Sequence, residues 1–380
     1  MLQEAEVTAK MPSLMEGFES LPDPRDNRGK RHRLSFVVAG VSLAIMVGRA
    51  TLSSIHRFFR NRVELVREIT DQPQGRAPSR AHLPRLLSVL EWTAVNELLE
   101  NHFGVRLERS GGEWTAIDGK TLRGSDEQSE RTLLAVSHTE REILAQRRLP
   151  GRKTAEVTAA RELLQETGLE AANVTLDALH LNPKTTAQIH HASGKYLIQM
   201  KENQPKLRAQ VKAWAEATKP LGTVRTTDRG HGRLELRQGT LFSLEGLSLP
   251  ERWHESGLAT LLVMERETTR LATGATSAET SYYVSNQALS NEQAKAQRIL
   301  FDAVRNHWRV EADNNIRDVT FREDHIRTKN GNQAQVLACL RTLAMRLFRK
   351  ARITNFQAAT EDFTDSPTRF HSFLAQTGFL

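Results

Sequence analysis

The chain has 380 residues, which is too long for one average domain, so its length predicts two domains or one large domain with an insertion. Its formal net charge of +8 favours a polyanionic partner (DNA, RNA or an anionic membrane), although a solvated basic surface explains the charge equally well. A single cysteine, Cys339, excludes an intramolecular disulfide and a multi-cysteine zinc site. Apolar neighbours predict that Cys339 is buried.

The most apolar window, residues 34–48, is shorter than the roughly 20 residues that span a bilayer. Arg33 and Arg49 bracket this window closely, so we interpret it as a buried core helix and exclude membrane insertion. The N-terminus has no basic-then-apolar secretory pattern. We expect a cytoplasmic protein.

Residues 1–105 are predicted to be a helical N-terminal domain. The window at 34–48 is expected to continue into LSSIHRFF, and a second amphipathic segment follows the turn-rich DQPQGRAPSR. The segment PRDNRGKRHR (24–33) is basic and rich in turn residues. It is expected either to contact a DNA backbone or to form a solvated loop. Its candidate DNA-binding residues are Arg28, Lys30, Arg31 and Arg33.

From Trp114 onward, short apolar runs alternate with helical patterns. EWTAIDG predicts a strand, and TLLAVSHTE with EILAQRRLP predicts a hairpin. A helix (TAEVTAARELLQETGL), a strand (ANVTLDALHL), a helix beginning near Pro183 and a strand (KYLIQMKEN) follow. This order predicts a mixed α/β sheet.

A β-rich block of four strand-like runs occupies residues of about 222–288, so an insertion is expected at about 205–290. Helical patterns return at NEQAKAQRILFDAVRNHWRVEADNNIRDV and at residues 333–349, where Val336, Leu340, Leu343 and Leu347 form an apolar stripe. The sheet domain is therefore expected to cover residues 106–350, followed by a C-terminal tail at 351–380.

Three acidic residues in separate contexts suit one metal site. Asp118 and Asp177 each end an apolar, strand-like run, and Glu311 lies in a helical stretch. Carboxylates at strand ends can converge with one on a later helix and hold two divalent cations. Each acid has an ordinary alternative: a turn aspartate for Asp118, a helix N-cap for Asp177 and a solvated helix face for Glu311.

Other residues near these acids are candidates for supporting roles. Lys120 and Arg123 follow Asp118 closely enough to neutralise a phosphate, whereas the letters GKT (119–121) lack the upstream glycine of a nucleotide-binding loop. His180 could orient a carboxylate, although packing explains it better. Four further carboxylates compete with Glu311: Asp313, Asp318, Glu323 and Asp324.

The run RNHWRVEADNNIRDVTFREDHIRTKNGNQAQVLACLRTLAMRLFR resembles the C-terminal signature of DDE transposases of the ISAs-type, or H-repeat-associated, group of bacterial insertion sequences. AIDGKTLRGS, TLDALH, YLIQMKENQP, RGHGRLELR and YYVSN resemble its other blocks in the same order, and the N-terminal part is similar to the domain associated with it. Family members often carry Ile-Glu-Asn and Leu-His-Trp where this chain has Val310-Glu311-Ala312 and Asn314-Asn315-Ile316.

The resemblance implies a ribonuclease-H-like mixed sheet with a β-rich insertion, preceded by a helical N-terminal domain. It implies that Asp118, Asp177 and Glu311 are the catalytic residues and bind Mg²⁺ (two ions, with Mn²⁺ as a substitute). It implies double-stranded DNA as partner, cut and joined by phosphoryl transfer, and a homodimer on DNA. The further candidate DNA contacts are Lys201, Arg229, His231, Arg233, Arg305 and His307.

Two other functions stay open on the sequence. A domesticated nuclease would cut DNA without strand transfer, and a catalytically silent DNA-binding protein would show salt-sensitive binding without cutting. A small-molecule α/β enzyme is disfavoured, because the chain has no nucleophile elbow and no dinucleotide-binding loop.

Overall fold

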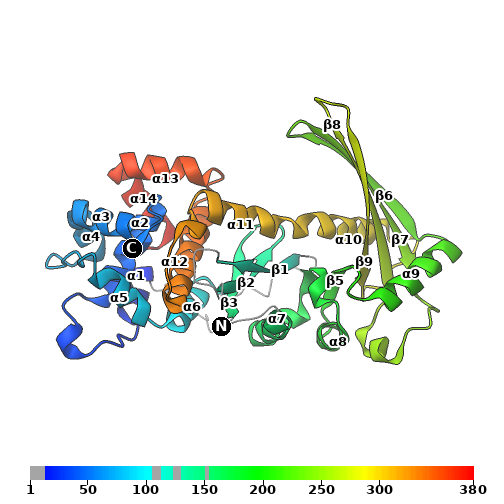
Figure 1. Ribbon diagram of the computed structural model, residues 1–380, viewed down its shortest axis with the longest axis horizontal. Coiled ribbons are helices and arrows are strands. Elements are labelled where there is room, and N and C mark those ends of the chain that lie inside the picture. The colour runs from blue at the N-terminus through cyan, green and yellow to red at the C-terminus, as the bar shows by residue number, and fades with distance from the viewer. Residues whose placement is uncertain (1–12, 105–112, 123–129, 150–153) are drawn as a thin grey trace, which may run out of the picture.

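The computed structural model describes residues 13–104, 113–122, 130–149 and 154–380. They form a helical region, a nine-stranded mixed sheet and a long helical segment that runs from the sheet back to the helices (Figure 1). The prediction of a mixed α/β fold with a helical N-terminal region is confirmed, and the architecture is consistent with a ribonuclease-H-like domain.

The N-terminal helices are α1 (Leu14–Glu19), α2 (Leu34–Met46), α3 (Leu52–Asn61), α4 (Val63–Thr70), α5 (His82–Val89) and α6 (Trp92–Phe103). Every residue of α2 is buried, which confirms it as a core helix. The expected continuation into the next helix is interrupted, because Gly48 takes a positive φ of 75° and Thr51 caps α3. No helix in the described part of the chain is both long enough and apolar enough to cross a bilayer.

The C-terminal tail packs against the N-terminal helices. Helices α13 (Phe356–Asp365) and α14 (Pro367–Thr377) share one hydrophobic core with α1 and α2 (Figure 1). The backbone amide of Leu14 donates to the carbonyl of Gly378 at 3.2 Å, which joins the two ends of the described chain. Helix α12 (Gly331–Lys350) packs against α2, α5 and α6, and its residues 333–348 are all buried.

The central part of the sheet contains β1 (Trp114–Thr121), β2 (Arg131–Ser137), β3 (Ile143–Leu149), β4 (Asn173–Leu176) and β5 (Lys195–Met200). Strands β1, β4 and β5 are parallel neighbours, and β2 and β3 form the predicted hairpin beside β1. Helices α7 (Thr154–Thr167) and α8 (Pro183–His191) connect the parallel strands, as a parallel order requires.

The insertion extends the same sheet. After α9 (Pro205–Ala217), the strands β6 (Gly222–Gly230), β7 (Arg233–Ser243), β8 (Thr260–Arg270) and β9 (Thr276–Ser285) continue the order as β5-β9-β8-β7-β6. Their outer halves curve away from the body of the molecule (Figure 1). The chain then returns along α10 (Ala294–His307) and α11 (Arg309–Val319), which the sequence predicted as one helix and which the structure divides at Trp308.

Candidate active site

Asp118 lies on β1, on the sheet face that α11 covers. Side chains alternate along a strand, so Asp118 shares its face with Ala116 and Lys120. Ala116 belongs to the hydrophobic core that contains residues of α12, and the Lys120 ammonium contacts Asp318 of α11. Glu311 is in the first turn of α11, the helix that packs on β1.

Asp177 follows the last residue of β4, the parallel neighbour of β1. Its side chain accepts a hydrogen bond from the backbone amide of Leu179 at 3.0 Å and caps a short 3-10 helix, Ala178–His180. The capping alternative therefore describes what this carboxylate does in the structure. One oxygen is engaged by the cap, and the side chain remains 44% exposed.

The electrostatics of Asp118 show that the three acids lie in one region. Burial first, and then the negative charges of Asp177, Glu156 and Glu311, raise the pKa of Asp118 to about 6. Burial also raises the pKa of Glu311, against a lowering by the charge of Lys201. Carboxylates that repel one another in this way become favourable when a cation joins them.

The donor set suits a hard divalent cation, because carboxylate oxygens are the ligands that Mg²⁺ prefers in proteins. In the described part of the chain, however, no group of three or more histidine, cysteine, aspartate or glutamate residues is close enough to hold a metal. The fold therefore brings the charges of Asp177 and Glu311 close enough to act on Asp118, without forming a complete metal cage among the described residues.

The competing carboxylates are all committed to partners. Asp313 pairs with Arg141 at 2.6 Å and with Arg349, and Asp318 pairs with Lys120. Glu323 lies 3.4 Å from Arg317, and Asp324 also has interactions. By contrast, none of the described residues forms an ion pair with Asp118 or Glu311. Pairing thus separates the acids that hold the fold together from those that remain available.

Glu156 is a fourth carboxylate that sequence reasoning missed. It lies in the first turn of α7, behind β1, and its charge contributes to the raised pKa of Asp118. Its side chain pairs with Arg131 and lies 3.9 Å from Nε2 of His180. A Cβ on Gly119 would come within 2.4 Å of Oε1 of Glu156, so only glycine lets this carboxylate approach the strand. No spacing in the sequence signals this contact.

His180 is both a packing residue and a neighbour of the site. It is fully buried, and its Nε2 lies 3.7 Å from Oδ1 of Asp177 and 3.9 Å from Glu156. Neither ring nitrogen has a hydrogen bond. The packing role and the place beside a carboxylate, which the sequence offered as alternatives for His180, are therefore compatible.

A buried chain of polar side chains joins α10 to the sheet. The Thr175 hydroxyl on β4 lies 2.9 Å from His138 Nε2 and 2.9 Å from His307 Nδ1. Burial is the main cause that lowers the pKa of His138 to about 3 and that of His307 to about 4, so both are neutral near pH 7. This chain fixes the end of α10, and with it the start of α11.

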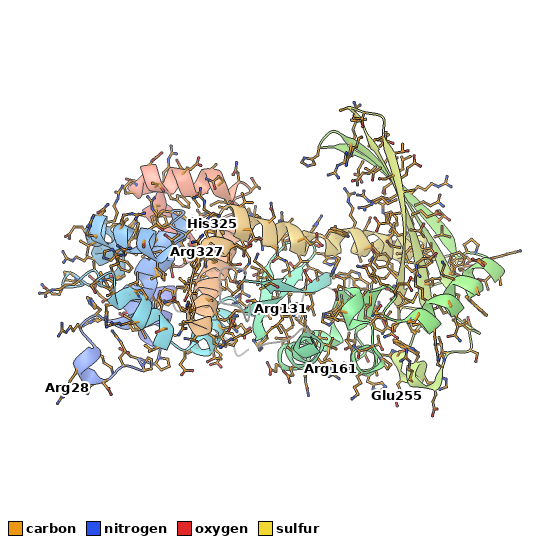
Figure 2. The ribbon with its side chains drawn as sticks, viewed as in Figure 1. Arg28, Arg131, Arg161, Glu255, His325 and Arg327 are labelled. Atoms are coloured by element: carbon orange, nitrogen blue, oxygen red, sulfur yellow. The ribbon has the colours of Figure 1, made fainter. Side chains whose placement is uncertain are left out.

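The candidate DNA contacts fall into three groups. Lys120 and His307 have partners inside the protein, and Arg123 lies outside the described residues. Lys201 is exposed, and its charge acts on Glu311; Arg305 is exposed on the neighbouring helix α10. The others are exposed further away, either in the N-terminal helical part, where Figure 2 shows Arg28 at the end of the molecule opposite the insertion, or at the β6–β7 turn: Arg28, Lys30, Arg31, Arg33, Arg229, His231 and Arg233.

The β6–β7 turn has a defined conformation. Arg229 and Arg233 flank a two-residue connection in which His231 and Gly232 have φ values of 48° and 72°. Two consecutive positive φ values are the mark of the tight hairpin turn that matches the twist of antiparallel strands. The turn therefore projects two arginines and a histidine from the end of a long ribbon.

Comparisons with known proteins agree with this arrangement. The model of the family described as "Transposase DDE domain" matches residues 109–347, and the model described as "DDE_Tnp_1-associated" matches residues 15–103. The chain is 25% identical over 358 residues to "Putative transposase YncI" of Escherichia coli O157:H7, covering 90% of this chain and 88% of that protein.

It is also 24% identical over 359 residues to "H repeat-associated putative transposase YhhI" of Escherichia coli (strain K12), covering 90% of this chain and 92% of that protein. The first family model spans more than half of the chain and contains Asp118, Asp177 and Glu311. The chain therefore belongs to the DDE transposase family and carries the associated N-terminal domain of that family.

Proposed function

We propose that the protein is a DNA transposase that cuts the ends of its element and joins them to target DNA, with Asp118, Asp177 and Glu311 as its catalytic carboxylates. The observation that carries the proposal is the selective lack of ion pairs. Among the residues that the structure describes, no cationic side chain forms an ion pair with Asp118 on β1 or with Glu311 on α11, whereas Asp313, Asp318 and Glu323 are paired.

The three carboxylates are the proposed ligands of Mg²⁺, for which Mn²⁺ is an expected substitute. Divalent cations held there supply charge neutralisation at phosphate and a lowered pKa for water, the two things that phosphoryl transfer needs most. The protein contributes a fixed face: the sheet orients Asp118, the 3-10 helix orients Asp177, and α11 orients Glu311.

The proposed reaction has two steps. In the first, a water oxygen bonds to phosphorus at the element end, the bond from phosphorus to the 3′ oxygen breaks, and that oxygen takes up a proton. In the second, the freed 3′ hydroxyl attacks a phosphate of target DNA and displaces another 3′ oxygen. Lys201 and Arg305 are the proposed phosphate contacts, and the β6–β7 turn and residues 24–33 are proposed to hold DNA further away.

Pairing two element ends requires two active sites, so we propose that the protein works as a homodimer on DNA. The direct test is cleavage of a labelled duplex carrying the element end by the purified full chain with Mg²⁺. Asp118→Asn, Asp177→Asn and Glu311→Gln should each reduce the rate by roughly a hundredfold or more, the scale of losing one charge-stabilising group.

Asp318→Asn is the matched control, because Asp318 lies seven residues from Glu311 on α11 and its partner Lys120 keeps a second carboxylate, Glu323, at 3.8 Å. It should keep the folded protein active. If Asp318→Asn abolished cutting while Glu311→Gln did not, the assignment of Glu311 would be wrong. Cutting without strand-transfer products would identify a nuclease, and binding without cutting would identify a silent DNA-binding protein.

A further inference from the structure

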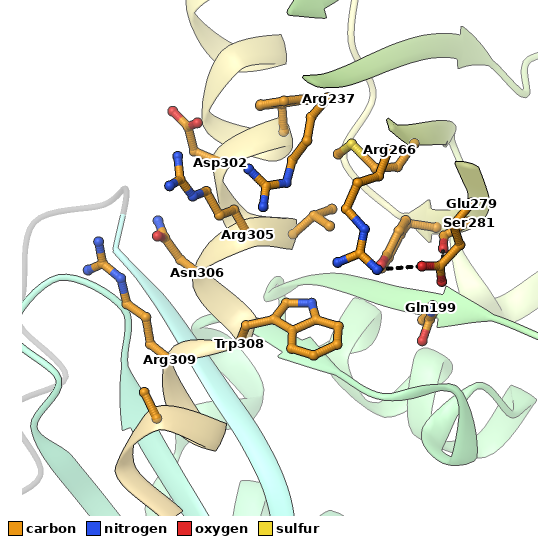
Figure 3. Close-up of a pocket in the computed structure, with 15 residues that line it drawn as sticks. Gln199, Arg237, Arg266, Glu279, Ser281, Asp302, Arg305, Asn306, Trp308 and Arg309 are labelled. Atoms are coloured by element: carbon orange, nitrogen blue, oxygen red, sulfur yellow. Dashed lines mark hydrogen bonds and ion pairs between the residues drawn. The ribbon is translucent and has the colours of Figure 1, made fainter. Parts of the chain in front are cut away.

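A pocket of about 720 Å³ lies between the insertion and the junction of α10 with α11. Figure 3 shows Arg237 and Arg305 on one side, Arg266 on the other and the ring of Trp308 between them. Arg309 and Ala312 continue the lining, so the pocket reaches the turn of α11 that carries Glu311. A ligand in this pocket would therefore adjoin the candidate active site.

The lining has the chemistry of a nucleic-acid contact. Four arginines line the pocket beside two acids, Asp302 and Glu279. The indole of Trp308 is 54% exposed, which is unusual for the largest apolar side chain. Guanidinium groups pair with phosphate in a bidentate manner, and an exposed aromatic ring offers a surface for a base or sugar.

Two of the four arginines already share one anion. Oδ2 of Asp228 on β6 lies 2.6 Å from Nη1 of Arg237 on β7 and 3.0 Å from Nη1 of Arg305 on α10. A single carboxylate oxygen thus bridges the insertion to the helix that leads to Glu311. Two guanidinium groups converging on one oxygen is the arrangement that a phosphate oxygen also satisfies.

We propose that this pocket binds a DNA strand beside the cutting site, with Arg237 and Arg305 exchanging Asp228 for a DNA phosphate. In the absence of DNA, Asp228 occupies the phosphate position and holds the insertion against α10. Binding exchanges one ion-pair partner for another, so the carboxylate competes with DNA and lowers its affinity. The inference rests on the proposed function for its ligand, and it adds a site and a competitor that the proposed function does not contain.

The exposures of the three side chains allow this exchange. Arg305 is 49% exposed and Asp228 is 35% exposed, so solvent and a phosphate can reach the pair, whereas Arg237 is 17% exposed and is held in place by Glu235. A half-exposed ion pair contributes little to stability and breaks easily. The anchored Arg237 fixes the position of the site, and the exposure of Arg305 and Asp228 makes it accessible to a ligand.

The test measures binding of a fluorescent DNA duplex, and of the matching single strand, to the full chain in EDTA by anisotropy at several salt concentrations. Asp228→Asn keeps the shape of the side chain and removes the competing charge. It should bind DNA roughly five- to tenfold more tightly at low salt. A plot of the logarithm of its association constant against the logarithm of the salt concentration should also be steeper than that of the wild type. The increase in slope should be about 1, the value for one additional phosphate contact.

The control is the ion pair between Asp362 and Arg369, which lies in the C-terminal helices and has a similarly exposed aspartate. Asp362→Asn changes the net charge by the same amount and frees one arginine outside the pocket. If Asp228→Asn and Asp362→Asn bind DNA equally, the proposed exchange is wrong. Soluble polyglutamate and unlabelled DNA are then compared as competitors for the labelled DNA bound to Asp228→Asn. If polyglutamate competes as well as DNA does, the pocket is an acidic-peptide site instead.

A second variant covers the case in which Asp228→Asn disturbs the hairpin. Arg305→Gln removes one guanidinium and leaves the Arg237–Asp228 pair intact, and it should weaken binding several-fold and make the salt dependence shallower by about one contact. Equal binding by Arg305→Gln and by Arg369→Gln would overturn the proposal. All assays are free of metal, so loss of cutting and loss of this pocket give different results.

Discussion

The ion pairs around α11 and those of the insertion differ in burial. The buried pairs around α11 position the candidate active site, whereas the exposed pairs of the insertion are available to bind a ligand. At the seam between α11 and α12, Asp313 is 0% exposed between Arg141 and Arg349, and Lys120 is 6% exposed between Asp318 and Glu323. In the insertion, Arg266 and Glu279 are 37% and 58% exposed, and Asp228 and Arg305 are similarly accessible.

Buried pairs cannot change partners cheaply, because a charge left alone in the interior costs several kcal/mol. They therefore fix α11 on the sheet and set the position of Glu311. Exposed pairs cost little to break, so the same kind of contact in the insertion can yield to a ligand. One chain uses the same residue types to build a rigid site and an exchangeable surface.

The largest test of this contrast removes a buried charge. Asp313→Asn would leave Arg141 and Arg349 without their shared carboxylate, so we expect a loss of about 3–5 kcal/mol in the free energy of unfolding. Urea denaturation measures this loss. An unfolding free energy within 1 kcal/mol of the wild type would show that the seam is not what holds α11.

A second test crowds the back of the site. Gly119→Ala would place a Cβ 2.4 Å from Oε1 of Glu156, which is buried and paired with Arg131. We expect a loss of about 1–3 kcal/mol and a displaced β1, because overpacked interiors relax poorly. Thermal unfolding and DNA cleavage would both report it. Gly40→Ala, which meets the ring of Phe59 at 2.3 Å among the N-terminal helices, is the matched control: it should lower stability without the same loss of cutting.

A third test uses pH. The pKa of Asp118 is raised to about 6 from its ordinary value of 3.8, so the folded protein binds more protons than the unfolded one between these values. Stability from this group is fully present below about pH 4 and is lost as the pH rises through about 6. In EDTA at pH 7.5, Asp118→Asn should therefore be more stable than the wild type by up to about 2 kcal/mol.

The stability difference should shrink at pH 4, and Mg²⁺ should remove it at pH 7.5 by stabilising the wild type alone. Differential scanning fluorimetry across pH, with and without Mg²⁺, measures both effects. A difference that persists unchanged at pH 4 would contradict the cause given for the raised pKa of Asp118.

The smallest expected effect on stability comes from breaking an exposed ion pair of the insertion. Asp228→Asn should change the free energy of unfolding by less than about 1 kcal/mol, since surface ion pairs contribute little. Chemical denaturation of Asp228→Asn and Asp313→Asn in parallel compares the two losses in unfolding free energy directly. A loss as large as that of Asp313→Asn would mean that the insertion pair is structural and not exchangeable.

Local patterns were enough to predict much of the fold. The hairpin at β2–β3, the order of strands and helices, the buried α2 and the buried Cys339 all follow from hydrophobic periodicity and turn residues. The break at Trp308 was not predicted, because both sides of it continue a helical pattern and the bend depends on contacts with the sheet.

The candidate site was predictable only in part. Asp177 follows the end of β4 as predicted, and β1 and β4 are the expected parallel neighbours. The prediction that Asp118 ends its strand is wrong, because β1 continues to Thr121 through its pairing with β2. Glu156 could not be found, because its role depends on a glycine without a Cβ and on Arg131, which lies 25 residues away in the sequence. The shared anion of Arg237 and Arg305 depends on a hairpin meeting a distant helix, and no local pattern records it.

By itself, the sequence determined the types and order of the elements, the positive charge and a short set of candidate acids, because these depend on residues near one another in the chain. Only the tertiary structure decided which acids have no ion-pair partner among the described residues. Lys120 and Asp318 are 198 residues apart in sequence, and such partners meet only after the sheet and the last helices have packed. Ion pairing over that distance separates the available Asp118 and Glu311 from their paired neighbours.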